Sequence, residues 1–90
     1  MPRPYKTSKE LDRILKKLQK KNKQLYENLF NKMNEVLNNP DIEHYKNLKH
    51  NLKEYKRVHI GSFVLLFKYD NQNDFVYFTD FDHHDKIYIN

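Results

Sequence analysis

Cysteine is absent from this chain of 90 residues, and glycine occurs once, at Gly61. Without cysteine the protein can form no disulfide bond and can offer no thiolate ligand to zinc. With one glycine it has no glycine-rich loop of the kind that cradles nucleotide phosphates. No run of about 18 or more apolar residues is available to span a bilayer, and residues 1–10 lack the apolar segment of a secretory signal. We therefore expect a cytoplasmic protein with no membrane partner and no small-molecule cofactor.

Negative charge is scarce in the first two thirds of the chain. Residues 1–39 contain ten Lys or Arg against four Asp or Glu, and residues 40–59 contain five against three. Residues 60–90 reverse the balance, with two basic and five acidic residues, and the whole chain carries +5. A basic field of this kind predicts a nucleic acid or an acidic protein as the partner. A solvated, lysine-rich helix face would have the same composition.

The first 40 residues carry the signals of a short strand and two helices. Residues 3–7 favour a strand, which Pro4 would confine to a sheet edge. Thr7 and Glu10 fit a capping box at the start of a helix. Two apolar stripes with helical spacing follow, separated by the polar residues 20–23: Leu11, Ile14, Leu15 and Leu18, and then Leu25, Leu29, Met33, Val36 and Leu37. The pattern, which ends at Pro40, predicts an antiparallel helical hairpin.

Strand patterns dominate the second half of the chain. Residues 54–60, 63–69 and 75–81 are predicted strands, and Gly61 lies in the turn between the first two. The order β-α-α-β-β-β predicts a single α+β domain over residues 1–90, with the helical hairpin packed on one face of a mostly antiparallel four-stranded sheet. Seven aromatic residues fall in the last two strands: Phe63, Phe67, Tyr69, Phe75, Tyr77, Phe78 and Phe81. We expect most of them to form the core, although aromatic side chains on a sheet can also stack on RNA bases.

A group of basic residues precedes and enters the strand at 54–60. It consists of Lys49, Lys53, Lys56 and Arg57. Lys56 and Arg57 are neighbours, so their side chains should leave opposite faces of the strand, and His59 should share the face of Arg57. The guanidinium of Arg57 suits bidentate contact with a phosphate. The alternative is ordinary solvated charge on a strand.

The chain ends on a second group, which contains His83, His84 and Tyr88. Histidine titrates near neutral pH and is the natural general acid or base, and a tyrosine can stack on a base or take part in proton transfer. A polar turn with an edge-packed tyrosine would explain the same residues. We do not expect a metal site, because adjacent positions in a strand or tight turn do not readily converge on one ion with Asp82 or Asp85.

Residues 48–88 resemble the RelE/ParE superfamily of toxins from toxin–antitoxin systems. The family pattern Leu-Lys-x-x-Leu matches residues 48–52, and Tyr-x-Arg-x-x-x-Gly matches residues 55–61. A closing pattern of His-Arg-x-x-x-Tyr resembles residues 83–88. The preceding short strand and helical hairpin agree with the family's β-α-α-β-β-β order. The resemblance therefore extends over nearly the whole chain.

The resemblance implies a RelE-like mRNA interferase, a metal-independent endoribonuclease that cuts mRNA in the ribosomal A site. In such toxins the 2′-hydroxyl of the mRNA attacks the adjacent phosphate and leaves a 2′,3′-cyclic phosphate and a 5′-hydroxyl. By position, Arg57 would stabilise the transition state, His83 or His84 would transfer protons, and Tyr88 would stack on or orient a base. Lys49, Lys53, Lys56 and His59 would contact RNA. The implied partners are the ribosome, mRNA and a RelB-like antitoxin.

Two positions depart from the family pattern. Val64 follows Phe63 where the family often has an arginine, and His84 replaces the closing arginine. Loss of one charged stabiliser can lower a rate by about 10²–10³. Two other functions therefore stay open. One is a ParE-like inhibitor of DNA gyrase that cuts nothing, and the other is an inactive basic module that binds RNA or the ribosome.

Overall fold

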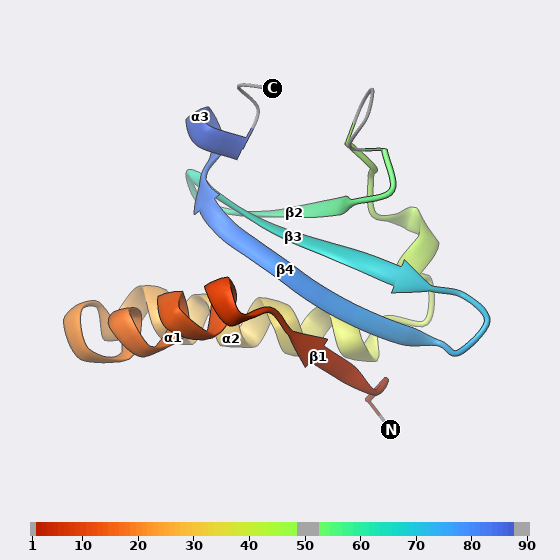
Figure 1. The fold of residues 1–90 in the computed structure, drawn as a ribbon, viewed down its shortest axis with the longest axis horizontal. Coiled ribbons are helices and arrows are strands. Elements are labelled where there is room, and N and C mark those ends of the chain that lie inside the picture. Colours follow the sequence, from red (N-terminus) through yellow and green to blue (C-terminus); the bar gives the residue numbers. More distant parts are fainter. Residues whose placement is uncertain (1, 49–52, 88–90) are drawn as a thin grey trace.

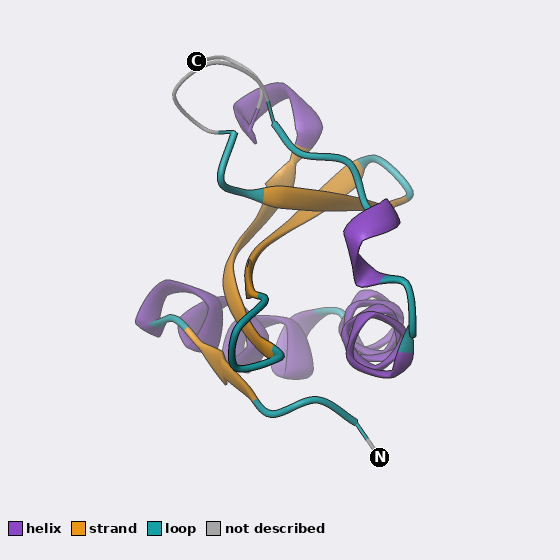
Figure 2. Ribbon diagram, turned by 90° about the vertical axis from the view of Figure 1, so that its right-hand side faces the viewer, coloured by secondary structure: helices purple, strands orange, loops and turns teal. Residues whose placement is uncertain are grey.

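The computed structural model describes residues 2–48 and 53–87, and it has the α+β architecture that the sequence predicts. The elements in chain order are β1 (Tyr5–Thr7), α1 (Lys9–Lys21), α2 (Lys23–Asn38), the 3-10 helix η1 (Ile42–His44), β2 (Lys56–Ile60), β3 (Phe63–Asp70), β4 (Phe75–His83) and α3 (His84–Ile87). The hairpin of α1 and α2 lies along one face of the sheet, and α3 lies on the opposite side (Figures 1 and 2). No helix in the described ranges is long and apolar enough to cross a bilayer.

The helical hairpin is capped by Ser8 and Asn22. The Ser8 hydroxyl oxygen accepts a hydrogen bond from the Leu11 N–H at 3.0 Å, and the same hydroxyl donates to the Thr79 carbonyl at 2.6 Å. The prediction of Thr7 as the N-cap was therefore wrong by one residue. Thr7 is held in β1 by its pairing with Phe78, so the helix starts one position later. Asn22 ends α1 and caps α2, because its N–H donates to the Leu18 carbonyl and its side chain accepts from the Leu25 N–H.

The sheet has the strand order β1-β4-β3-β2. β1 is an edge strand, as Pro4 predicted, and pairs in parallel with β4. The other two pairings are antiparallel, so the sheet is mostly antiparallel as predicted. β2 starts at Lys56 and not at residue 54. Gly61 occupies the turn after β2 with a φ of 61°, a left-handed conformation that glycine adopts without steric strain.

The main core lies between the sheet and the helical hairpin. Phe67 and Phe78 are completely buried and pack with α-helical residues such as Leu11 and Leu29. Phe81 is also buried, and Phe63 stacks on it with ring centroids 5.1 Å apart. Five of the seven aromatic residues of β3 and β4 belong to the main core or pack against it: Phe63, Phe67, Tyr69, Phe78 and Phe81. The expectation that most of them form the core is confirmed.

A smaller apolar cluster covers the other face of the sheet. Its buried members are Leu48, Val64, Leu66 and Ile87, and Tyr55 packs against them. Lys68 lies over the Tyr55 ring at 4.7 Å and forms an ion pair with Glu54 at 3.3 Å. The cluster therefore holds both α3 and the segment that leads into β2 on this face.

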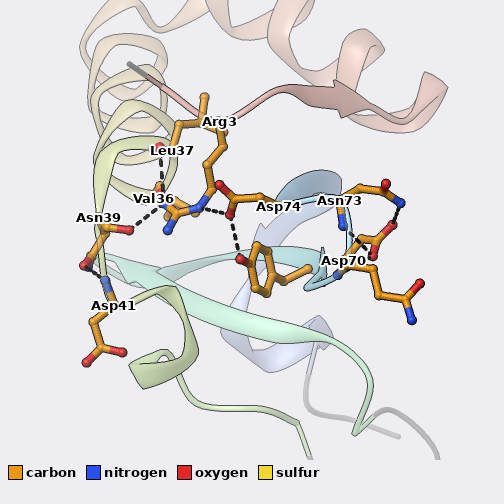
Figure 3. A network of polar contacts seen from close by, with 10 residues as sticks. Arg3, Val36, Leu37, Asn39, Asp41, Asp70, Asn73 and Asp74 are labelled. Atoms are coloured by element: carbon orange, nitrogen blue, oxygen red, sulfur yellow. Dashed lines mark hydrogen bonds and ion pairs between the residues drawn. The ribbon is translucent and has the colours of Figure 1, made fainter.

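Arg3 joins three distant parts of the fold (Figure 3). Its guanidinium donates to the carbonyl oxygens of Val36 and Leu37 at the end of α2. It also forms an ion pair of 2.7 Å with Asp74. Asp74 lies in the β3–β4 turn and accepts a second hydrogen bond from the Tyr69 hydroxyl at 2.6 Å. These contacts satisfy carbonyl groups that a helix end leaves without partners and fix the N-terminal segment beside the turn.

Candidate active site

The face of the sheet that α1 and α2 leave uncovered, which we call the outer face, carries the candidate residues of β2. Val58 and Leu65 pair with each other and pack in the main core. Side chains alternate along a strand, so Arg57 and His59 leave β2 on the outer face with their partners Leu66 and Val64. The predicted separation of Lys56 and Arg57 onto opposite faces is confirmed by this register.

Arg57 and His59 contact each other directly. Arg57 Nη1 lies 2.9 Å from His59 Nε2. A guanidinium is always protonated and can only donate. In this hydrogen bond the imidazole nitrogen is therefore the acceptor. The pair offers a fixed positive charge beside an imidazole, with His59 exposed to solvent.

Two carboxylates share the outer face. Sequence reasoning considered Asp82 only as a metal ligand and did not include Asp80. Asp80 pairs with Leu66, the partner of Arg57, and Asp82 pairs with Val64, the partner of His59. Burial raises the pKa of Asp80, and the charge of Asp82 raises it further, although a hydrogen bond from the Phe81 N–H opposes the shift. In the sequence, Asp80 and Asp82 flank the apolar Phe81, and this alternation could have indicated that the two acids share a face.

The histidines near the chain end lie where β4 passes into α3. His83 ends β4 and meets the Phe63 ring edge to face, with centroids 5.7 Å apart. His84 begins α3, and its ring stacks on that of His83 at 4.6 Å. Ile87 then packs into the small cluster on the outer face. Ile87 thus holds this segment against the sheet.

The side chains of His83, His84 and Asp85 converge, contrary to the sequence-based expectation. Asp85 Oδ2 lies 3.4 Å from His83 Nδ1, and Asp85 Oδ1 lies 3.1 Å from His84 Nδ1. One ligand atom from each residue falls within 4.8 Å of the others. The change from strand to helix at His84 makes this possible, because the backbone turns between the two histidines and brings their rings to one side.

The other predicted RNA contacts have different positions. Lys56 is only 7% exposed, and its Nζ donates to the Tyr45 carbonyl and to Asn47 Oδ1, each at 3.1 Å. A buried ammonium held in this way does not fit the predicted role of Lys56 as an RNA contact. Lys53 is exposed in the turn before β2. Lys49 and Tyr88 lie outside the described residues.

Val64, which stands where the family often has arginine, is completely buried. It is covered by Ile87 and Leu48 in the small cluster. An arginine at this position would have to displace α3. Where the family often has a charged arginine, this chain therefore has an apolar valine, and Val64 provides the contact on which α3 packs.

Among the predicted residues that the structure describes, His59, His83 and His84 lie toward the same end of the sheet but do not meet at one point. His59 and His83 lie in neighbouring rows of the register, because Val64 pairs with Asp82 and Phe63 pairs with His83. The Arg57–His59 pair faces outward, whereas His83 packs against Phe63. Together they can supply a fixed cation and imidazoles able to transfer protons.

The family described as the ParE toxin of the parDE type II toxin–antitoxin system matches residues 5–88. This chain belongs to that toxin family. A protein of Methanocaldococcus jannaschii that carries the provisional name toxin RelE4 is 53% identical over 79 residues, which are 87% of this chain and 82% of that protein.

Two solved structures have the same fold. The RelBE2 toxin–antitoxin complex of Mycobacterium tuberculosis contains a chain that matches with a TM-score of 0.75 and 19% identity, over 93% of each chain. YafQ of Escherichia coli matches with a TM-score of 0.72 and 20% identity, over 96% of this chain and 98% of that one. At these identities the likeness concerns the fold alone. Family membership rests on the sequence matches.

Proposed function

We propose that this protein is a ribosome-dependent endoribonuclease that cuts mRNA in the A site and so inhibits translation. The observation that carries the proposal is the contact between Arg57 and His59 on the outer face of β2. His83 lies two strands away, in the neighbouring row of the sheet. Membership of the toxin family supports it. The cytoplasm is the compartment in which such an enzyme would meet ribosomes.

The reaction proceeds through attack by the mRNA itself. The 2′-hydroxyl oxygen forms a bond to the adjacent phosphorus as His83 or His84 removes its proton. The bond from phosphorus to the 5′-oxygen then breaks, and the leaving oxygen takes a proton from a second acid. Arg57 stabilises the negative charge that develops on the pentavalent phosphorus. Tyr88 orients the substrate base, and the products are a 2′,3′-cyclic phosphate and a 5′-hydroxyl.

The distribution of charge sets the direction in which RNA crosses the outer face. Arg57 lies on β2, whereas Asp80 and Asp82 lie on β4, two strands away. Phosphates are attracted to the β2 side and repelled from the β4 side. We therefore place the RNA backbone along β2, with Lys53 and Lys49 as further phosphate contacts before the strand. Lys56 has no part in this arrangement.

The protein partner in this proposal is a RelB-like antitoxin of acidic, amphipathic character. The related Mycobacterium tuberculosis structure is a toxin–antitoxin complex. On this chain, Phe30 is 42% exposed on α2 and stacks with Tyr26 at 6.0 Å. An exposed phenylalanine that stacks on a half-buried tyrosine, beside lysine-rich helices, suits an antitoxin segment with apolar and acidic side chains.

A ParE-like gyrase inhibitor is the second candidate function. It is favoured by Val64, which is buried where a RelE-like nuclease often has arginine, and by the two carboxylates on β4. A toxin that only binds its target needs no cluster of cations around a reacting phosphate. Inhibition of gyrase supercoiling without any RNA cleavage would identify this function.

The first test is to add purified protein to a translating extract and to map mRNA ends by primer extension. We expect cuts positioned by codon. Arg57→Ala and His83→Ala should each slow cleavage by more than about tenfold, the low end of what acid–base and charge-stabilising groups contribute. Arg57→Ala should lower the rate more than the affinity for ribosomes, because its contact strengthens in the transition state.

The matched controls are an arginine and a histidine that lie outside the proposed site. Arg13 is 77% exposed on α1, and His44 is exposed on η1, so Arg13→Ala and His44→Ala should retain cleavage within about twofold. If the wild type makes no cuts but sediments with ribosomes, the protein is a binding module and the nuclease proposal fails.

A further inference from the structure

The ligand atoms of His83, His84 and Asp85 converge, with one atom from each residue within 4.8 Å of the others. A zinc ion with four ligands at about 2.0–2.1 Å holds neighbouring ligand atoms about 3.3–3.4 Å apart. Asp85 Oδ2 is 3.4 Å from His83 Nδ1, and Asp85 Oδ1 is 3.1 Å from His84 Nδ1. Both imidazoles thus present Nδ1 to the same carboxylate, each to a different oxygen, so that a small adjustment of the side chains would bring three ligand atoms around one ion.

The hydrogen bonding of His83 fixes the orientation of its ring. The main-chain N–H of Asp85 donates to His83 Nδ1 at 3.2 Å, and the same nitrogen lies 3.4 Å from Asp85 Oδ2. The ring therefore presents Nδ1 toward Asp85, as a shared cation requires. A bound ion would take the place of the hydrogen bond from the Asp85 N–H, because an imidazole nitrogen has a single lone pair.

We propose that His83, His84 and Asp85 bind one zinc-class divalent cation. Two imidazole nitrogens and one carboxylate oxygen form a ligand set suited to Zn²⁺, Ni²⁺ or Cu²⁺, whereas Mg²⁺ and Ca²⁺ prefer oxygen ligands alone. His84 and Asp85 are exposed and His83 is half-buried, so the ion reaches the site from solvent. A fourth position on the ion is left for water or a phosphate oxygen.

Metal binding would regulate the reaction proposed above, and this consequence rests on the proposed function. A zinc ion bound by His83 and Asp85 would tie the ring to the carboxylate and prevent it from turning toward the RNA. Zinc therefore acts as an inhibitor of cleavage, whereas the metal site itself exists whether or not the protein cuts RNA.

The test is a calorimetric titration of tag-free protein with ZnCl₂ in a buffer that does not bind metal, with MgCl₂ as the comparison. We expect one zinc ion per chain and no binding of magnesium. His84→Gln and Asp85→Asn should weaken zinc binding at least about tenfold, since even loss of an outer-shell partner costs that much. His44→Gln is the matched control, because His44 is also exposed and lies beside an acidic residue, Glu43.

Proton NMR of the histidine side chains decides the ligand identity even if a variant folds poorly. Zinc should shift the ring signals of His83 and His84 and leave that of His44 unchanged. Equal weakening in His44→Gln, unchanged binding in Asp85→Asn, or no binding to the wild type would each overturn the proposed site.

The regulatory consequence has its own readout in the translating extract. Zinc should slow cleavage by the wild type at least about tenfold and should have no such effect on Asp85→Asn. Inhibition that persists in Asp85→Asn, or zinc binding that leaves cleavage unchanged, would overturn the regulation. If the wild type cuts nothing even without zinc, the proposed function fails, and the titration still decides the metal site.

Discussion

Lys56 and Arg57 are neighbours on β2, but their side chains have different environments. The stem of Lys56 is buried and its ammonium group serves main-chain carbonyls before β2, including that of Tyr45. Arg57 points to the outer face and contacts His59. One side chain therefore stabilises the fold, and the next faces outward, where the proposed function assigns it to RNA. The alternation of a β-strand makes this division possible over a single peptide bond.

Substitution at these two positions should separate stability from activity. Lys56→Met keeps the apolar stem but leaves the buried carbonyl groups without a donor. We expect the free energy of unfolding to fall by about 1–3 kcal/mol, with cleavage per folded molecule kept within about twofold. Arg57→Ala should change the free energy of unfolding by less than about 0.5 kcal/mol and abolish most cleavage. Urea unfolding and primer extension on both variants would measure this, and a reversed pattern would contradict the assignment.

At the scale of elements, α3 is a short helix with few contacts to the sheet. It has four residues, and Ile87 provides its buried contact with Val64 and Leu66. The same short helix carries His84 and follows directly on His83. The hydrogen bond from the His84 N–H to the Ser62 carbonyl at 3.0 Å also holds the start of α3. The position of the proposed proton-transfer groups and metal ligands therefore depends in part on one apolar side chain.

Ile87→Ala should release α3 without unfolding the domain. The main core lies on the other face of the sheet and does not include this residue. We expect amide hydrogen exchange in residues 84–87 to accelerate at least about tenfold, because a local opening of the fold governs it. Cleavage should fall by a similar factor. Ile14→Ala on α1 is the control, and an equal effect of that variant on residues 84–87 would argue against local release.

At the scale of the whole molecule, Arg3 and Asp74 link the N-terminal segment, the end of α2 and the β3–β4 turn (Figure 3). Hydrogen bonds from Tyr69 and Arg3 lower the pKa of Asp74 from its ordinary value of 3.8. A carboxyl group whose pKa is lower in the folded state stabilises that state above its unfolded pKa. This contribution is lost as the pH falls through the folded pKa.

The expected result is a loss of stability in acid that depends on Asp74. The midpoint of thermal unfolding of the wild type should fall as the pH drops from about 5 to below 3.8, the ordinary pKa of the group. Asp74→Asn should have a lower midpoint at neutral pH and a flatter dependence on pH. Asparagine also tolerates the φ of 50° at this position. Glu27→Gln, an exposed change on α2, should retain the wild-type slope, and an equally steep slope in Asp74→Asn would exclude the link.

The sequence by itself determined the kind and order of the main helices and strands, the edge position of β1 and the family. These follow from periodicity, from Pro4 and from short motifs, which act over a few residues. It also predicted that Lys56 and Arg57 point to opposite faces. It could not tell which of them would be buried, because that depends on how the segment before β2 folds back over the strand.

Only the tertiary structure decided what the candidate site contains. The strand register places Asp80 across the sheet from Arg57 and Asp82 across the sheet from His59. This register shifts at an irregularity between Leu66 and Phe67. The convergence of the residues at 83–85 comes from the change of strand into helix, which the docking of Ile87 on the sheet supports. Register and docking are set by contacts between residues far apart in the chain, and no local pattern contains them.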